Sequence, residues 1–243
     1  MRIKQTLASL VIGAAAAAMP AMADTIFYDG FEDDPVGSPP SSWIIANEEP
    51  DTSSLVSNEQ SYTGQQSLHL HDPWWSPGYA QVRRSIDQDL NRTEVEWYGK
   101  KQLEAQKTGF GSINGTDMFG FTGHFTGYDF EGYVGVGWGG DPWHPDEAVK
   151  LLDLDDSWFK FRIEADRIAG TVNYRATNMN TGETGELLNQ QYSSSAFSYF
   201  SLSTLPDFTG DCFIDNVSIV PETSGLVLLA AGAAASALGR RRK

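Results

Sequence analysis

The feature that most constrains the fold is a strict alternation of apolar and charged side chains between residues 159 and 166. The apolar positions are Phe159, Phe161, Ile163 and Ala165, and the charged positions are Lys160, Arg162, Glu164 and Asp166. A period of two predicts a β-strand that has one face on a hydrophobic core and the other in water.

Other short segments of similar character, separated by turn-forming residues, predict further strands. In one of them Leu68 and Leu70 share a face, and His69 and His71 share the other. The predicted strands cover residues 25–31, 43–46, 67–71, 80–86, 94–97, 158–166, 170–177, 197–203 and 212–219. Residues 47–66 are predicted to be a loop, and 180–182 a turn. No stretch of the mature chain has the period of an amphipathic helix, so we expect an all-β fold, a two-sheet antiparallel jelly-roll sandwich.

Both ends of the chain predict targeting segments. Residues 1–23 have a basic start with Arg2 and Lys4, an apolar stretch over 7–19, and small residues at Ala21 and Ala23. This is the pattern of a signal peptide that signal peptidase removes before Asp24. We therefore expect export, with a β-sandwich domain over residues 24–219 and a separate C-terminal segment over 220–243.

The C-terminal segment combines a short polar motif, an apolar run over 226–238 and a basic cluster over 240–243. The run is shorter than the roughly 20 residues that span a bilayer comfortably, so it predicts a thin transmembrane helix. The basic cluster should stay on the cytoplasmic side, which leaves the domain outside. A permanent anchor and a buried terminal helix are the alternatives.

Pro221, Glu222 and Thr223, with the apolar run and the basic end, resemble the PEP-CTERM sorting signal of Gram-negative bacteria. The family has a second proline where this chain has Thr223, whereas Ser224 fits the pattern. The resemblance implies that an exosortase-type protease processes the tail, so that the protein is anchored transiently and ends at the cell surface or in an extracellular biofilm matrix.

The composition of the mature domain excludes some partners. Residues 24–221 contain 31 acidic and 11 basic residues, a net charge of −20. Nucleic acid and anionic lipid both require basic surface, so neither is an expected partner. Cys212 is the single cysteine, so the domain has no internal disulfide. It falls in a predicted strand and is therefore expected to be a buried thiol.

The sandwich resembles the concanavalin A-like, laminin G-type jelly rolls of bacterial surface proteins. The resemblance is carried by Phe31-Glu32 and by residues 37–43, 64–70, 157–158 and 213–217. Galactose-binding-like jelly rolls share the motifs at the start and the end of the domain and are the alternative. The resemblance implies a structural Ca²⁺ held by Asp29, Glu32 and Asp215, and carboxylate oxygens suit that ion.

Asp215 is unusual because strand alternation places it on one face with Phe213, Val217 and Ile219. A carboxylate on an apolar face needs a partner, since a bare buried charge is costly. Besides calcium, two alternatives remain. The side chain could cap backbone N–H groups, or a bulge could turn it outward.

Aromatic side chains beside turn-forming residues predict a carbohydrate-binding surface, because tryptophan combines an apolar face with a polar N–H. The candidates are Trp74, Trp75, Trp138 and Trp143. The alternative is that most aromatic residues fill the core.

Two carboxylate pairs fit an enzyme, because glycoside hydrolysis usually needs two facing acids. They are Glu94 with Glu96, and Asp129 with Glu131. The Glu-x-Asp-x-x-Glu pattern of jelly-roll endoglucanases is absent, so an exposed acidic strand face is favoured. We therefore expect a non-enzymatic protein that associates with extracellular polysaccharide. A polysaccharide hydrolase or lyase, and a purely structural envelope component, are the alternatives.

Overall fold

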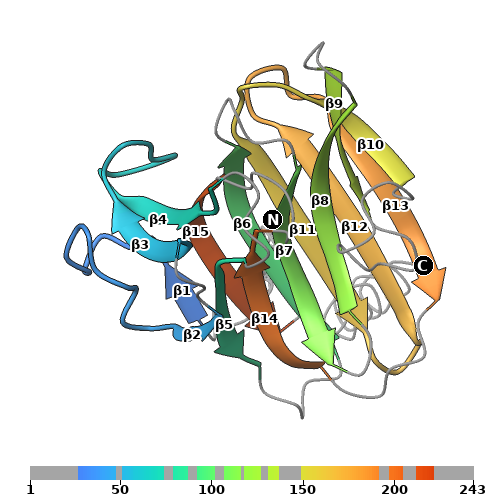
Figure 1. The fold of residues 1–243 in the computed structure, drawn as a ribbon. Coiled ribbons are helices and arrows are strands. Elements are labelled where there is room, and N and C mark those ends of the chain that lie inside the picture. The colour runs from blue at the N-terminus through green and yellow to red at the C-terminus, as the bar shows by residue number, and fades with distance from the viewer. Residues whose placement is uncertain are drawn as a thin grey trace, which may run out of the picture. The chain divides into compact units, whose positions relative to one another are not determined.

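The computed structural model describes residues 27–47, 51–73, 79–86, 92–101, 107–115, 118–126, 131–136, 149–191, 197–204 and 212–221. Within these ranges every regular element is a β-strand (Figure 1). The strands are β1 Phe27–Asp29, β2 Ile44–Asn47, β3 Ser53–Ser57, β4 Ser67–His71, β5 Gln81–Ser85, β6 Arg92–Lys101, β7 Lys107–Gly115, β8 Met118–Thr126, β9 Glu131–Val136, β10 Val149–Leu154, β11 Phe159–Asp166, β12 Thr171–Asn178, β13 Thr184–Gln191, β14 Phe197–Ser203 and β15 Cys212–Pro221.

The strands form two antiparallel sheets. The first has the order β13-β12-β11-β6-β15-β4-β3, with β1 also paired to β15, and the second has the order β10-β9-β8-β7-β14-β5-β2. The chain passes repeatedly from one sheet to the other, and its first and last strands are neighbours, with Phe27 opposite Ile219. The prediction of an all-β, two-sheet antiparallel jelly-roll sandwich is confirmed.

The core lies between the sheets and takes side chains from both. Trp97 of β6 and Phe200 of β14 belong to different sheets, yet their ring centroids are 4.9 Å apart. The alternation predicted for β11 is confirmed, because its four apolar side chains are buried and its four charged ones are half-buried. The thiol of Cys212 is buried, as predicted.

The prediction of a loop over residues 47–66 is wrong, because β3 lies within it and pairs with β4. Its buried face includes Ser54 beside Val56, so an apolar pattern is missing although the backbone is a strand. Five further strands, β7 to β10 and β13, were not assigned from the pattern. Several of them are rich in glycine or polar residues, which weakens the signal of a strand.

The face predicted for Asp215 is also wrong in part. Asp215 is opposite Tyr98 of β6, and Ser218 is opposite Glu96. Two residues of β15, Asn216 and Val217, therefore lie opposite the single residue Trp97 of β6. This is a β-bulge, and Asn216 within it has a positive φ of 49°. The extra residue reverses the alternation. Val217 and Ile219 therefore face the core, whereas Asp215 lies with Tyr98 on the outer face of the sheet.

The predicted signal peptide over 1–23 and the predicted apolar run over 226–238 lie outside the described residues. Of the C-terminal segment over 220–243, Val220 and Pro221 are described, and they end β15 opposite Glu94 and Thr93 of β6. In the part of the chain that the structure describes, no helix is long and apolar enough to cross a membrane.

Candidate functional site

The structure leaves the predicted sugar-binding tryptophans undescribed. Trp74, Trp75, Trp138 and Trp143 lie outside the described residues, and so does Asp129. Glu131 begins β9, but its side chain is not described.

Glu94 and Glu96 lie on the outer face of β6, and each is paired with a cation from β11. The Glu94 carboxylate is 2.6 Å from Arg162, and the Glu96 carboxylate is 2.8 Å from Lys160. Burial raises the pKa of Glu94, and the neighbouring Arg162 opposes that rise. The acidic face expected from the sequence is thus half-buried and neutralised by the next strand.

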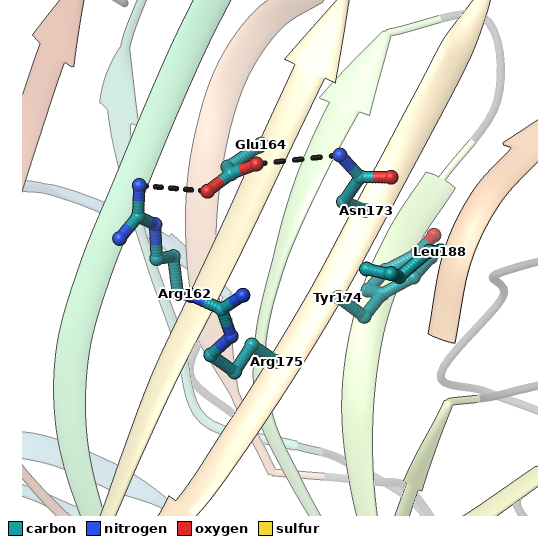
Figure 2. Close-up of a pocket in the computed structure, with 6 residues that line it drawn as sticks. All are labelled: Arg162, Glu164, Asn173, Tyr174, Arg175 and Leu188. Carbon is teal, nitrogen blue, oxygen red and sulfur yellow. Dashed lines mark hydrogen bonds and ion pairs between the residues drawn. The ribbon is translucent and has the colours of Figure 1, made fainter. Parts of the chain in front are cut away.

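The network continues from β11 to β12 through a hydrogen bond. Arg162 pairs with Glu94 and also with Glu164 on its own strand. Figure 2 shows the Arg162–Glu164 pair and the hydrogen bond of 3.3 Å that Asn173 of β12 donates to Glu164. A shallow pocket beside them, lined also by Tyr174, Arg175 and Leu188, offers about 10 Å³. This is roughly the room of one water molecule. The charged face is therefore a network between strands, and this pocket is too small for a sugar ring.

The three carboxylates predicted to hold calcium accept hydrogen bonds from N–H groups. Asp29 accepts one from the Phe31 backbone at 2.8 Å and one from the Trp43 indole at 2.9 Å. Glu32 accepts two from the backbone of Gln65 and Gln66, at 2.8 and 2.9 Å.

Asp215 is fully buried, and both of its oxygens accept backbone N–H groups. One oxygen accepts from Tyr62 at 2.8 Å and Thr63 at 3.0 Å, and the other accepts from Asn216 at 2.7 Å. The structure thus shows both alternatives to calcium, the capping side chain and the bulge. Burial raises the pKa of Asp215, although the three N–H groups act against the rise.

This arrangement does not fit a calcium ion. The ion needs oxygen ligands, whereas the groups that face these carboxylates are N–H donors. Among the described residues, no group of three His, Cys, Asp or Glu side chains could hold a metal.

A cluster of half-buried aromatic side chains lies on the outer face of the same sheet, and we call Tyr62, Tyr98 and Trp158 the Tyr62 patch. The rings of Tyr62 and Tyr98 are stacked, with centroids 3.9 Å apart and planes 13° apart. The Trp158 ring is 5.9 Å from Tyr62 and tilted by 58°. Tyr62 comes from the loop between β3 and β4, Tyr98 from β6, and Trp158 from the turn before β11.

Hydrogen-bonding and charged side chains border the Tyr62 patch. The Lys100 ammonium is 3.4 Å from the Asp156 carboxylate and 3.5 Å from the amide oxygen of Gln60. The Lys160 ammonium is 5.8 Å from the centroid of the Tyr98 ring. Burial raises the pKa of Tyr98 to about 12, so its hydroxyl stays neutral and can still donate a hydrogen bond.

The Tyr62 patch was not predicted from the sequence. Tyr98 follows Glu94 and Glu96 at the same period of two, so its outward direction was readable. Tyr62 stands in a stretch predicted to be a loop, and nothing local indicates that the loop folds back over β6. The patch depends on contacts between residues 36 to 96 positions apart in the chain.

No family model matches the chain, and no curated protein matches it significantly in sequence.

Among solved structures, the chain is similar to a carbohydrate esterase of the Shiga toxin-encoding bacteriophage phi24B, at 12% identity and a TM-score of 0.49, over 75% of this chain and 91% of that one. The exoplasmic/lumenal domain of VIP36, in a Ca²⁺/Man-bound form, gives 11% identity and a TM-score of 0.48, over 74% and 83%. The CBM22-1 xylan-binding domain of Xyn10C from Paenibacillus barcinonensis gives 13% and 0.41, over 83% and 97%. At these identities and scores the three neighbours say nothing about what this chain binds.

Proposed function

We propose that the protein is an exported, non-enzymatic polysaccharide-binding protein and that the Tyr62 patch is its sugar-binding surface. The observation that carries the proposal is the gathering of three half-buried aromatic rings on one sheet face, bordered by hydrogen-bonding side chains. Aromatic faces pack against the apolar faces of sugar rings, and polar neighbours bind the hydroxyl groups.

The ligand that fits this surface is a neutral polysaccharide. The two lysines beside the patch are already paired, Lys100 with Asp156 and Lys160 with Glu96. An acidic glycan would need these lysines, which already pair with carboxylates of the protein. It would also be repelled by a domain with a net charge of −20. A neutral glycan meets neither obstacle.

The ends of the chain support export as part of the proposal. Residues 1–23 have the pattern of a signal peptide, and residues 220–243 resemble a PEP-CTERM sorting signal. Signal peptidase and an exosortase-type protease would then deliver the domain to the cell surface or the extracellular matrix. The intact mass of the protein recovered from its host tests this step. We expect a product from Asp24 to near Glu222, and a product that keeps residues 240–243 would contradict tail processing.

Affinity electrophoresis in gels that contain a neutral or an acidic polysaccharide tests the binding. We expect neutral glucans or xylans to retard the wild type, and Tyr62→Ala and Trp158→Ala to restore free mobility. Leu188→Ala is the matched control, because Leu188 is an apolar side chain on the same sheet, 46% exposed and outside the patch. Unretarded wild type on all polymers would overturn the proposed function. Release of reducing ends from any of them would overturn its non-enzymatic part.

A further inference from the structure

We propose that Asp215 is the positioning residue of the Tyr62 patch: its carboxylate holds the loop between β3 and β4 so that Tyr62 lies stacked on Tyr98. This inference rests on the proposed function, because it assigns a role in binding to a residue that touches no ligand.

The register of β15 places Asp215 where it can do this. Asp215 directly precedes the bulge and lies opposite Tyr98 on the outer face of the sheet, yet it is fully buried. Its cover is the loop that carries Tyr62. The backbone N–H groups of Tyr62 and Thr63 both donate to the same carboxylate oxygen, at 2.8 and 3.0 Å. Hydrogen bonds to a charged acceptor are among the strongest in proteins.

The neighbouring residue reinforces the same contact. Asn216 donates from its side chain to the hydroxyl of Thr63 at 2.7 Å, and its backbone N–H binds the second oxygen of Asp215 at 2.7 Å. Asn216 lies in the bulge and has a positive φ of 49°. Two consecutive residues of one strand therefore hold this part of the loop, Asp215 through the backbone of Tyr62 and Thr63 and Asn216 through the Thr63 side chain.

A second carboxylate holds the far end of the same loop. Glu32 accepts the N–H groups of Gln65 and Gln66, and its own backbone carbonyl accepts a hydrogen bond of 3.0 Å from the Gln66 side chain. The two acids act on different residues, so they can be tested separately. Loss of Glu32 should free the end of the loop, whereas loss of Asp215 should free Tyr62 itself.

Binding depends on this arrangement through preorganisation. A Tyr62 ring that is already stacked on Tyr98 presents its outer face without a further loss of side-chain and loop entropy when a sugar arrives. If the loop is released, that ordering must be completed on binding, and the affinity falls.

The first test is amide hydrogen exchange measured by NMR on the full chain, which needs no ligand. In Asp215→Asn we expect the amides of Tyr62 and Thr63 to exchange at least about tenfold faster, while those of Gln65 and Gln66 keep their protection. Glu32→Gln should show the reverse pattern. Unchanged exchange at Tyr62 and Thr63 in Asp215→Asn would overturn the inference.

The second test is the affinity for the neutral polysaccharide that retards the wild type. We expect Asp215→Asn to bind about tenfold more weakly, and Asp215→Asn combined with Tyr62→Ala to bind no more weakly than Tyr62→Ala alone. Additive losses would show that Asp215 does not act through Tyr62. A lower melting temperature with unchanged affinity would mean a purely structural role and would overturn the inference.

If Asp215→Asn does not fold, Asn216→Gly serves in its place, because glycine accepts the positive φ. It removes the side-chain bond to Thr63 and the bond that the Tyr28 hydroxyl donates to Asn216, and Tyr28→Phe, which removes only the latter, is its control. We expect faster amide exchange at Tyr62 and Thr63 and weaker glycan binding, both smaller than in Asp215→Asn. Their absence would count against the inference. If the wild type binds no glycan, the proposed function fails, and the exchange rates alone decide whether Asp215 holds Tyr62.

Discussion

Gly64 offers a sensitive test of how firmly the loop that carries Tyr62 is held. Gly64 has a positive φ of 67°, and a Cβ atom at this position would lie 2.7 Å from Cδ of Glu32. Real Cβ atoms do not approach so closely, so Gly64→Ala must displace the Glu32 carboxylate or the loop. Either movement breaks the hydrogen bonds that Glu32 accepts from Gln65 and Gln66.

The expected cost has two parts. A left-handed backbone conformation costs a non-glycine residue about 1 kcal/mol. Two hydrogen bonds to a charged group contribute about 1.5 kcal/mol each when they are partly exposed. Gly64→Ala should therefore lower the free energy of unfolding by about 4 kcal/mol.

Gly182→Ala is the matched control. Gly182 also has a positive φ, of 75°, but a Cβ atom there would meet nothing within 4 Å. Its substitution should cost only the backbone part, about 1 kcal/mol. Urea denaturation followed by tryptophan fluorescence measures both variants against the wild type.

The comparison can refute the reasoning directly. If Gly64→Ala and Gly182→Ala cost the same, the Glu32 side chain moves aside freely and does not hold the loop. A third variant, Gly64→Ala with Glu32→Ala, separates the two parts. The double variant should be at most about 1 kcal/mol less stable than Glu32→Ala alone, because without the Glu32 side chain the new Cβ atom meets no clash.

Two further predictions concern the core and the expected metal. Burial lowers the pKa of Lys101 from 10.5 to about 8, and the nearby Asp156 carboxylate opposes this decrease. The folded state therefore holds this proton less tightly than the unfolded state. The cost of burying the charged Lys101 is complete below pH 8 and disappears as the pH rises to 10.5. Lys101→Met should therefore raise the free energy of unfolding by up to about 3 kcal/mol at pH 7 and by little at pH 10.5. Equal stability of variant and wild type in urea at pH 7 would contradict this. EDTA should leave the melting temperature unchanged, because N–H groups engage the carboxylates of Asp29, Glu32 and Asp215. A decrease that Asp215→Asn abolishes would restore the calcium prediction.

The local pattern was enough to predict the strands whose two faces meet different surroundings. β11 alternates throughout between buried and half-buried side chains, β4 does so from Leu68 onward, and both were predicted within a residue of their bounds. β3 was missed because buried Ser54 replaces the apolar residue that the pattern requires. The period of two reports what a side chain faces, and it fails where a polar side chain is buried.

The candidate site was predicted only in its parts. The sequence identified Asp215 as a residue that needs a partner, and it left N–H capping and a bulge open as alternatives to calcium. It could not identify the partner, because Tyr62 lies 153 positions earlier in the chain.

The sequence by itself determined the class of fold and the acidic charge of the domain, because both depend on composition or on short periods, and it predicts targeting segments at the two ends. The tertiary structure alone decided which face Asp215 occupies and what covers it. A bulge of one residue reverses the alternation of a strand, and its place is fixed by pairing with another strand. The stacking of Tyr62 on Tyr98 joins residues 36 positions apart, so no window of neighbouring residues contains it.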